Sequence, residues 1–332
     1  MAPTVLVITA LEDVTADMVV AALNERGTSV VRVDPAGIGS DLFFRAGIGQ
    51  DSMVWGGRLR TASREVELEE VTAVYYRRPT PYAAGYQHLP QQPREFATAE
   101  ARHGLGGVLN NLYGVLYVND PAAVTRADFK PAQLQRFVEL GLRIPPTLVT
   151  NEVQAAKEFA AKHEHVIYKP FRGLPRSEDG YTGAIWAQRV DPGTFDSDIA
   201  VTAHLFQAEI AKVGDVRVTV VGRRAFAQRI TTRDGVLDWR RGNWDELIHA
   251  PIAVPKPVEA ALHSYLVSFG LVFGCFDFAL TGNGDAAEDW TAIECNPNGQ
   301  WGWLPDASAI TGTFADILSG REAAGYGESR RL

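Results

Sequence analysis

The sequence has little cysteine: only Cys275 and Cys295 occur among 332 residues. Both lie in apolar segments, which indicates buried, reduced thiols in a cytoplasmic protein rather than a disulfide framework. The sequence leaves open whether the two thiols face each other across a hairpin. No apolar run reaches membrane-spanning length, and the N-terminus lacks the pattern of a signal peptide. We therefore expect neither a membrane protein nor a secreted one.

Positive charge is also in deficit. The formal net charge is −8, and the isoelectric point is near 5.4. This balance argues against a general affinity for nucleic acid or for anionic membranes, although it permits a local basic pocket.

Common catalytic arrangements are missing as well. The seven histidines are scattered, and His103, His204 and His249 show neither triad nor metal-ligand spacing, so we expect packing or surface roles for them. The first strand, 4–9, is followed by ALED at 10–13 instead of a glycine-rich turn, which excludes a dinucleotide-binding Rossmann unit. Without a cysteine nucleophile motif or a Ser/His/Asp arrangement, neither redox nor acyl-enzyme chemistry is indicated.

What the sequence does contain is the composition of an ordinary globular protein, with 46% hydrophobic and 22% charged residues. Its length allows two or three domains. A strand at 4–9, a helix at 17–26 and a strand at 29–33 predict a parallel α/β start. A domain boundary is expected near Asp120, which can cap a short helix with Pro121 at its first position.

One strand pair carries the strongest chemical signal. Strands are predicted at 272–281 and 290–295, joined by a turn rich in glycine and asparagine. Glu294 and Asn296 share a face of the second strand, and an antiparallel partner would bring Asp277 beside Glu294. Two carboxylates and an amide oxygen with no nearby histidine suit a hard cation such as Mg²⁺. The alternative is a strand pair whose acids face water.

Basic residues precede this strand pair. Lys130 starts a predicted helix, and Lys169 ends a predicted strand ahead of a glycine-bearing segment, 171–183, that we expect to form a mobile flap. Both lysines are candidate phosphate ligands, with a surface role as the alternative. Arg77 and Arg78 follow another predicted strand, where they either face a substrate or are solvated.

Further cations lie between the lysines and the acids. Two predicted strands, 215–221 and 225–231, would project the guanidinium groups of Arg217 and Arg229 from neighbouring positions. A polar loop with the sequence DWR follows at 238–240.

This order of residues resembles that of the ATP-grasp ligases, which hold ATP between a central and a C-terminal domain. The resemblance spans essentially the whole chain and rests on Lys130, Lys169-Pro170, Phe206-Gln207, Asp215-Val216-Arg217, Phe276-Asp277-Phe278 and Glu294-Cys295-Asn296. It implies an α/β (α+β) ATP-grasp fold. A parallel α/β domain at 1–118, a small central domain at 119–203 and a C-terminal antiparallel-sheet ATP-binding domain at 204–332 are expected.

Within this superfamily the sequence looks most like the ribosomal peptide maturases, the graspetide or microviridin-type synthetases. The distinguishing pieces are YRRP at 76–79, DWR at 238–240 and NPNGQW at 296–301. The resemblance implies an enzyme that uses ATP to join Asp or Glu side chains of a precursor peptide to Ser/Thr or Lys side chains, giving macrocyclic esters or amides. Ala208 is a departure, because relatives often have an acid directly after the hinge glutamine, whereas here Glu209 comes one place later.

The resemblance gives each candidate residue a role, since activating a carboxylate crowds negative charge that Lys, Arg and Mg²⁺ must neutralise together. We assign Mg²⁺ to Asp277, Glu294 and Asn296. We assign ATP to Lys130, Lys169, Gln207, Glu209, Ile210 and Asp215. Arg217 is assigned to the acyl phosphate, with Arg229 and Arg240 as neighbouring catalytic residues. The peptide substrate is assigned to Arg77, Arg78, Asp238 and Asn298. No residue stands out as the base for an incoming hydroxyl.

The implied partner is a ribosomal precursor peptide with a leader and a core segment, and neither nucleic acid nor a membrane. A homodimer is left open, because no interface is evident from the sequence. The alternative function is an ATP-grasp ligase for a small amino acid or peptide, similar to glutathione synthetase or a glutamate-adding ligase. A catalytically silent nucleotide-binding scaffold is a third hypothesis.

Overall fold

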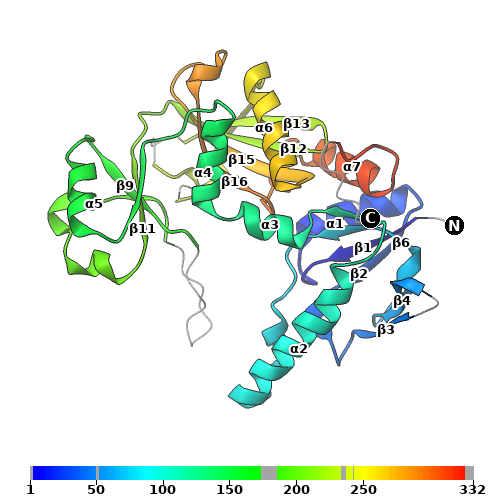
Figure 1. Cartoon of the computed structure of the whole chain (residues 1–332). Coiled ribbons are helices and arrows are strands. Elements are labelled where there is room, and N and C mark those ends of the chain that lie inside the picture. The colour runs from blue at the N-terminus through cyan, green and yellow to red at the C-terminus, as the bar shows by residue number, and fades with distance from the viewer. Residues whose placement is uncertain (1–2, 50–51, 173–184, 233–236, 242, 326–332) are drawn as a thin grey trace.

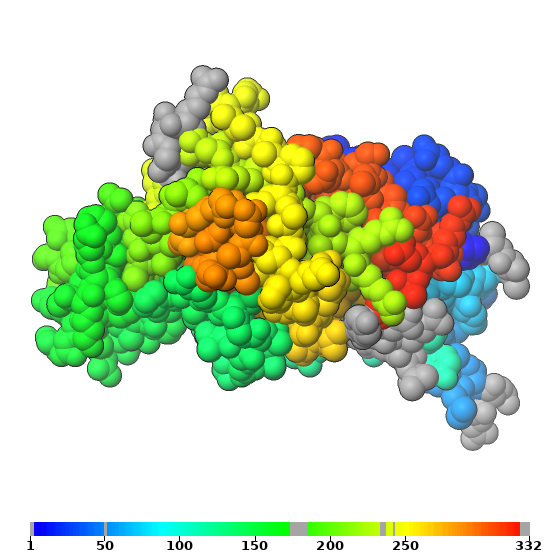
Figure 2. Space-filling view, turned by 90° about the horizontal axis from the view of Figure 1, so that it is seen from above, coloured from blue at the N-terminus to red at the C-terminus, as the bar shows by residue number. Residues whose placement is uncertain are grey.

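The computed structural model describes residues 3–49, 52–172, 185–232, 237–241 and 243–325. Its strands form four sheets. Figure 1 shows the N-terminal parallel sheet at one end of the molecule, the small central sheet at the other end and the C-terminal sheet between them. Figure 2 shows the same order in a view turned by 90°. The described chain is therefore elongated, and the C-terminal sheet has a neighbour on each side.

The N-terminal sheet is parallel, with strand order β2-β1-β6-β7. Its strands are β1 (Thr4–Ile8), β2 (Ser29–Val33), β6 (Val71–Tyr76) and β7 (Leu116–Val118). Every residue of β1 is buried, which explains its continuous apolar sequence, because both faces of a parallel sheet are covered. The helices α1 (Val14–Glu25) and α7 (Ala307–Leu318) cover one face, and α2 (Gln91–Leu109) covers the other.

Two details of this region differ from expectation. Helix α1 starts before the predicted 17–26 because the Asp13 carboxylate accepts a hydrogen bond from the Ala16 amide, 3.2 Å away, and so caps the helix at its first turn. A hairpin, which the sequence predicts at 53–59 and 65–68, exists as β4 (Ser52–Arg60) and β5 (Glu65–Glu67), but a third strand, β3 (Phe43–Gly49), pairs along the outer side of β4.

The C-terminal sheet is antiparallel, with strand order β14-β13-β12-β15-β16. These strands are β12 (Gly214–Val221), β13 (Arg224–Thr231), β14 (Ile248–Pro251), β15 (Phe273–Leu280) and β16 (Trp290–Asn296). One face packs on α3 (Pro121–Ala127), α4 (Lys130–Glu139) and α6 (Lys256–Phe269). Near the N-terminal sheet, the opposite face packs against α7. Toward the central sheet, that opposite face is polar.

The central sheet is smaller and has its own core. It consists of β8 (Thr147–Thr150), β9 (Val166–Lys169), β10 (Gln188–Arg189) and β11 (His204–Ala208), in the order β10-β9-β11-β8, and α5 (Val153–Ala160) packs against it. The predicted fold class is confirmed: a parallel α/β sheet precedes a small mixed unit and an antiparallel sheet. The domain ranges given above stay predictions.

The two cysteines do not face each other. Cys275 lies opposite Asn296 in the β15–β16 ladder, and Cys295 lies opposite Phe276, so their side chains project from opposite faces of the sheet. Both are free and buried, and burial raises the pKa of each thiol. They are packing residues of two separate cores.

Candidate nucleotide-binding and catalytic site

Two adjoining pockets lie between the central sheet and the polar face of the C-terminal sheet. Their volumes are about 70 and 440 Å³. They share six lining residues: Lys169, Ala187, Asp238, Arg240, Ile293 and Glu294. The smaller pocket reaches Ala208, Ile210 and Asp215, whereas the larger reaches Lys130, Arg172 and Asn296. Charged side chains therefore line both pockets, and the smaller pocket also has an apolar wall.

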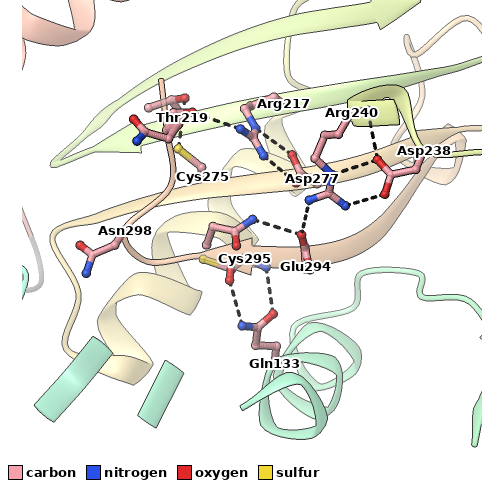
Figure 3. Close-up of polar contacts among 12 residues, drawn as sticks. Gln133, Arg217, Thr219, Asp238, Arg240, Cys275, Asp277, Glu294, Cys295 and Asn298 are labelled. Carbon is pink, nitrogen blue, oxygen red and sulfur yellow. Dashed lines mark hydrogen bonds and ion pairs between the residues drawn. The ribbon is translucent and has the colours of Figure 1, made fainter. Parts of the chain in front are cut away.

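The two predicted metal-binding acids meet as the sequence predicts. Asp277 of β15 lies directly opposite Glu294 of β16 in the antiparallel ladder. Both oxygens of the buried Asp277 carboxylate accept from Arg217, from Nε at 2.9 Å and from Nη2 at 2.8 Å (Figure 3). This bidentate pair fixes the plane of the guanidinium group, because both partners are planar forks.

Glu294 is held by three donors. Lys130 Nζ lies 2.6 Å from Oε2, and Arg240 Nη1 and Asn296 Nδ2 each lie 3.2 Å from Oε1. Burial alone raises the pKa of this carboxyl, but the charges of Lys130 and Arg240 outweigh that effect and hold its pKa well below its ordinary value. Glu294 is therefore an anion throughout the physiological range.

Ion pairs and aromatic rings restrict the orientations of Arg240 and Arg217. Arg240 forms a bidentate pair with the buried Asp238, with nitrogen–oxygen distances of 2.9 and 3.0 Å. The Arg217 guanidinium lies over the rings of Trp239 and Trp303, 5.3 and 5.7 Å from their centroids. Such stacking restricts the guanidinium to one orientation and keeps water from its faces.

Lys169 differs from these cations because no described residue accepts a hydrogen bond from it or forms an ion pair with it. Its side chain borders both pockets. Burial disfavours the charged ammonium and lowers the pKa of Lys169 to about 8. An anion in the cleft would restore the charged form.

The hinge residues at the end of β11 and directly after it lie in two different environments. Ala208 and Ile210 line the smaller pocket, while Gln207 is buried and donates to Thr147 Oγ1 at 2.9 Å. Glu209 points to a different side and pairs with Arg189. The one-place shift of this acid therefore takes it out of the smaller pocket.

Asp215 does lie in the smaller pocket. Both of its oxygens accept from Lys212, at 2.8 and 2.7 Å, and the same ammonium donates to the Leu237 carbonyl at 2.8 Å. Burial raises the pKa of Asp215 to about 6, although the Lys212 charge opposes the shift. Lys212 is a pocket residue that the sequence reasoning did not single out, since one lysine in a polar turn gives no signal.

The structure does not bring Arg229 to the site. Arg217 lies opposite Gln228 in the β12–β13 ladder, and Arg229 lies opposite Val216, a core residue of the helix-covered face. Neighbouring strands put directly opposed residues on the same face, so Arg229 projects away from the cleft. Its Nη2 donates instead to the Val213 carbonyl at 3.2 Å.

The arginines predicted to bind substrate also lie elsewhere. Arg77 is 2% exposed and pairs with Asp13 inside the interface with the N-terminal sheet, so its side chain forms no substrate-facing surface. Arg78 is exposed, and its guanidinium donates to the Asn298 carbonyl at 3.1 Å. The Asn298 side chain points away from the Arg217–Asp277 pair (Figure 3). Of the four predicted substrate residues, only Asp238 lines the cleft.

An aromatic cluster next to Arg217 was not foreseen as a unit. The rings of Trp239, Trp244 and Trp303 lie between 5.1 and 5.5 Å from one another, and His249 lies 5.4 Å from Trp303. Trp244 is 49% exposed. The only sequence signal was the concentration of tryptophan around the polar DWR loop. Most of the expected flap at 171–183 lies outside the described residues.

Comparison with known proteins places this geometry in a family context. The MvdD pre-ATP grasp domain matches residues 4–125. A RiPP-associated ATP-grasp ligase from Chryseobacterium gregarium, solved in complex with ADP and a leader and core peptide, is 25% identical. It aligns with a TM-score of 0.88 over 99% of this chain and 100% of that one.

Two enzymes from Microcystis aeruginosa are also similar. Macrocyclase MdnC, bound with precursor peptide MdnA, is 26% identical, with a TM-score of 0.83 over 96% of this chain and 100% of that one. Macrocyclase MdnB is 25% identical, with a TM-score of 0.75 over 95% and 99%. No curated protein matches the chain. The resemblance inferred from the sequence is confirmed, and it extends over nearly the whole length.

The remaining features of the described residues concern metal binding and membrane spanning. Among the described residues, no group of three or more His, Cys, Asp or Glu side chains could hold a metal ion. A site built on Asp277 and Glu294 would therefore need ligands of another kind, such as the Asn296 amide oxygen. No helix in the described parts of the chain is long and apolar enough to span a membrane.

Proposed function

We propose that this ATP-grasp ligase macrocyclises a ribosomal precursor peptide by joining Asp or Glu side chains of the peptide to Ser/Thr hydroxyls or Lys amines. One observation carries the proposal: four basic side chains converge on two buried acids in the cleft beside the central sheet. The basic residues are Lys130, Lys169, Arg217 and Arg240, and the acids are Asp277 and Glu294. The similarity to peptide macrocyclases supports the choice of substrate.

The chemistry requires such a cluster. A carboxylate is a poor acyl donor because its leaving group would be oxide. Transfer of the γ-phosphoryl group of ATP to a peptide carboxylate breaks the bond to ADP and forms an acyl phosphate. A hydroxyl or amine then attacks the acyl carbon, phosphate departs, and the nucleophile loses its proton. The peptide loses one water for each bond formed.

Each cation has a distinct position in this scheme. Lys169 forms no ion pair with a described residue. Together with Lys130, it would neutralise the phosphates of ATP. Arg217 holds Asp277 through Nε and Nη2 and the Gln300 carbonyl through Nη1, and the second N–H groups of its two terminal nitrogens are proposed to bind the acyl phosphate. Arg240 links Asp238 to Glu294 and closes the other side of the cleft. Positioned charges of this kind stabilise a charged transition state without reorganisation.

The donor set fits Mg²⁺. Asp277, Glu294 and Asn296 would hold it, because carboxylate and amide oxygens are hard ligands, and three of the four carboxylate oxygens keep a lone pair beyond their single present partner. Mg²⁺ held by these residues would supply positive charge against the negative charge that develops during phosphoryl transfer.

The apolar part of the cleft suits the base of the nucleotide. Ala208, Ile210 and Ile167 provide apolar contacts, and the backbone of the hinge provides polar groups. Asp215 and Lys212 lie at the same end and would contact the ribose or base edge. A leader segment would bind outside this cleft and deliver the core peptide to it.

The proposal is tested with the purified protein, ATP, Mg²⁺ and a precursor peptide. The peptide is to be sought in the adjacent reading frames as a short sequence with a Thr/Ser- and Asp/Glu-rich C-terminal half. Mass spectrometry should show the loss of one water per bond, with one ADP released for each. A matched peptide with Asn and Gln in place of the core Asp and Glu should stay at its starting mass. If the intact peptide stays unchanged while a small amino acid is consumed with ATP, the small-substrate ligase replaces this proposal.

A further inference from the structure

The structure contains a polar connection that runs from the N-terminal sheet to the Arg217 guanidinium. We propose that Arg77, which follows β6, is a positioning residue: it fixes the loop after β16, residues 297–301, and through that loop the orientation of Arg217. The activity part of this inference rests on the proposed function, whereas the structural part does not.

The connection begins at a buried ion pair. Arg77 is one of the largest fully buried side chains in the described chain, and its Nε lies 2.8 Å from Asp13 Oδ2. Asp13 is itself fixed, since it caps α1 and accepts from the Thr9 hydroxyl at 2.8 Å. The guanidinium therefore has a rigid anchor on the N-terminal side.

The other edge of Arg77 holds the loop. Its Nη1 donates to the Gly299 carbonyl at 3.4 Å, and its Nη2 donates to Gln300 Oε1. The same Gln300 oxygen accepts from the Thr15 hydroxyl of α1 at 2.9 Å. Two donors from the N-terminal domain thus converge on one side-chain oxygen of the loop.

Gln300 passes this constraint on to the site. Its backbone carbonyl accepts from Arg217 Nη1 at 3.1 Å, while the rest of the Arg217 fork holds Asp277. The side chain of Gln300 is therefore held by the N-terminal domain, and its main chain holds the site arginine. A displacement of this residue would turn the guanidinium group.

The loop has little freedom to absorb such a displacement. A Cβ added at Gly299 would lie 2.5 Å from Cys275 Cβ, so the loop backbone packs directly on β15. The Gly299 amide also donates to the Asn296 carbonyl at 3.0 Å, which joins the loop to a proposed Mg²⁺ ligand. Movement at residue 300 is thus felt at both Arg217 and Asn296.

Simple attachment of the two domains does not require Arg77. Asn119 accepts from the amides of Val272 and Phe273 and donates to the carbonyls of Phe273 and Pro297, all within 3.0 Å. Arg26, the residue that follows α1, pairs with Asp316 of α7 at 2.8 Å. Burying a further guanidinium is a costly means of attachment, but its fork gives the loop a defined direction.

Four variants test the inference. Arg77→Met and Gln300→Met break the connection, and Gln300→Glu keeps the oxygen that accepts from Arg77 and Thr15. Arg26→Met is the control, since it removes an Arg–Asp ion pair that joins the N-terminal part of the chain to α7 and does not touch the loop. Two readouts are used: kcat and KM with ATP and the precursor peptide, and hydrogen exchange of residues 296–303 in the protein alone.

In the two Met variants we expect kcat to fall about tenfold or more, because small misplacements at a reacting centre are expensive, while KM for ATP stays unchanged. Exchange of residues 296–303 should be faster in both. Gln300→Glu and Arg26→Met should keep the wild-type kcat and exchange. If Arg77→Met does not fold, Gln300→Met, which removes no charge, decides the matter.

Wild-type kcat and exchange in Gln300→Met would overturn the inference, and so would an equal loss of kcat in Arg26→Met. If the wild-type enzyme does not convert the peptide, it is the proposed function that fails. Hydrogen exchange then decides alone whether Arg77 holds the loop.

Discussion

The C-terminal sheet has two polar interfaces that are built in opposite ways. Toward the N-terminal sheet, buried polar side chains pair with groups of the protein itself: Asn119 makes four hydrogen bonds, and Arg77 pairs with Asp13. Toward the central sheet, the interface is a cleft, and Lys169 borders it without a partner among the described residues.

The difference separates framework from ligand site. Buried polar groups that hydrogen-bond to one another form a rigid network, whereas a buried charge without a partner is unfavourable until a ligand supplies the opposite charge. By this criterion the N-terminal interface is fixed, and the central interface is prepared for an anion. Variants that change one interface and leave the other intact test this difference.

The largest effect is expected for Asp277→Asn. The amide cannot accept both prongs of Arg217 and is a poorer ligand for a hard cation, so turnover should fall by at least about a hundredfold. Peptide conversion followed by mass spectrometry measures this, with circular dichroism to check the fold. Asp316→Asn, which breaks an ion pair at the other interface, should remain active. Wild-type turnover of Asp277→Asn at limiting Mg²⁺ would contradict the metal assignment.

Arg217→Ala and Arg229→Ala form a matched pair from the same hairpin. We expect Arg217→Ala to lower the rate of water loss from the peptide by about a hundredfold and to leave ATP-analogue binding largely intact. Arg229→Ala should process peptide at the wild-type rate, because its side chain lies on the other face of the sheet. Similar losses in the two variants would show that the register argument does not locate the catalytic arginine.

Lys169→Ala should act on binding rather than on chemistry. Loss of a charge-assisted contact to phosphate is worth roughly 1.5–3 kcal/mol, about ten- to a hundredfold in affinity. Calorimetry with a non-hydrolysable ATP analogue measures the change. The control is Lys157→Ala on the exposed side of α5. Equal affinity in wild type and Lys169→Ala would move this lysine to a surface role.

The smallest effect concerns pH. The pKa of Lys169 is lowered from 10.5 to about 8 in the protein alone, and bound phosphate should raise it again by favouring the charged form. Nucleotide affinity should therefore be greatest below about pH 8 and weaken as the pH rises above that value, with proton uptake on binding. For folding the sign is reversed: between about pH 8 and 10.5 the unfolded chain binds more protons, so this group adds stability as pH rises.

Calorimetry in two buffers of different ionisation enthalpy measures the proton uptake. Lys169→Gln should abolish it. Uptake that persists unchanged in Lys169→Gln would assign the titration to another group.

The sequence predicted features that follow from the periodicity of a single strand or helix. It did not predict features that depend on strand register or on contacts between distant residues. Asp277 and Glu294 were placed side by side because each is an acid within an apolar strand and the two strands were predicted to pair. Arg229 was misplaced because the two-residue turn at Gly222 sets a register that pairs Arg217 with Gln228, and composition alone does not reveal that register.

Buried amides mark the same limit. Asn119 and Gln133 make hydrogen bonds to residues more than 150 positions away, at Phe273 and Cys295, and Gln133 also donates to the nearby Ala127 carbonyl. Nothing in their own neighbourhood distinguishes them from solvated side chains. The contacts of Arg77 and Arg78 were not predicted for the same reason, since the loop at 297–301 reaches them only in the folded chain.

Hydrogen exchange with and without ADP and Mg²⁺ tests the contrast between the two interfaces most directly. We predict slower exchange on binding in residues 166–169, 207–210 and 290–296, which border the cleft, and no change in α1 and α7 at the N-terminal interface. No slowing in the cleft segments, or equal slowing at both interfaces, would contradict the assignment of the cleft as the nucleotide site.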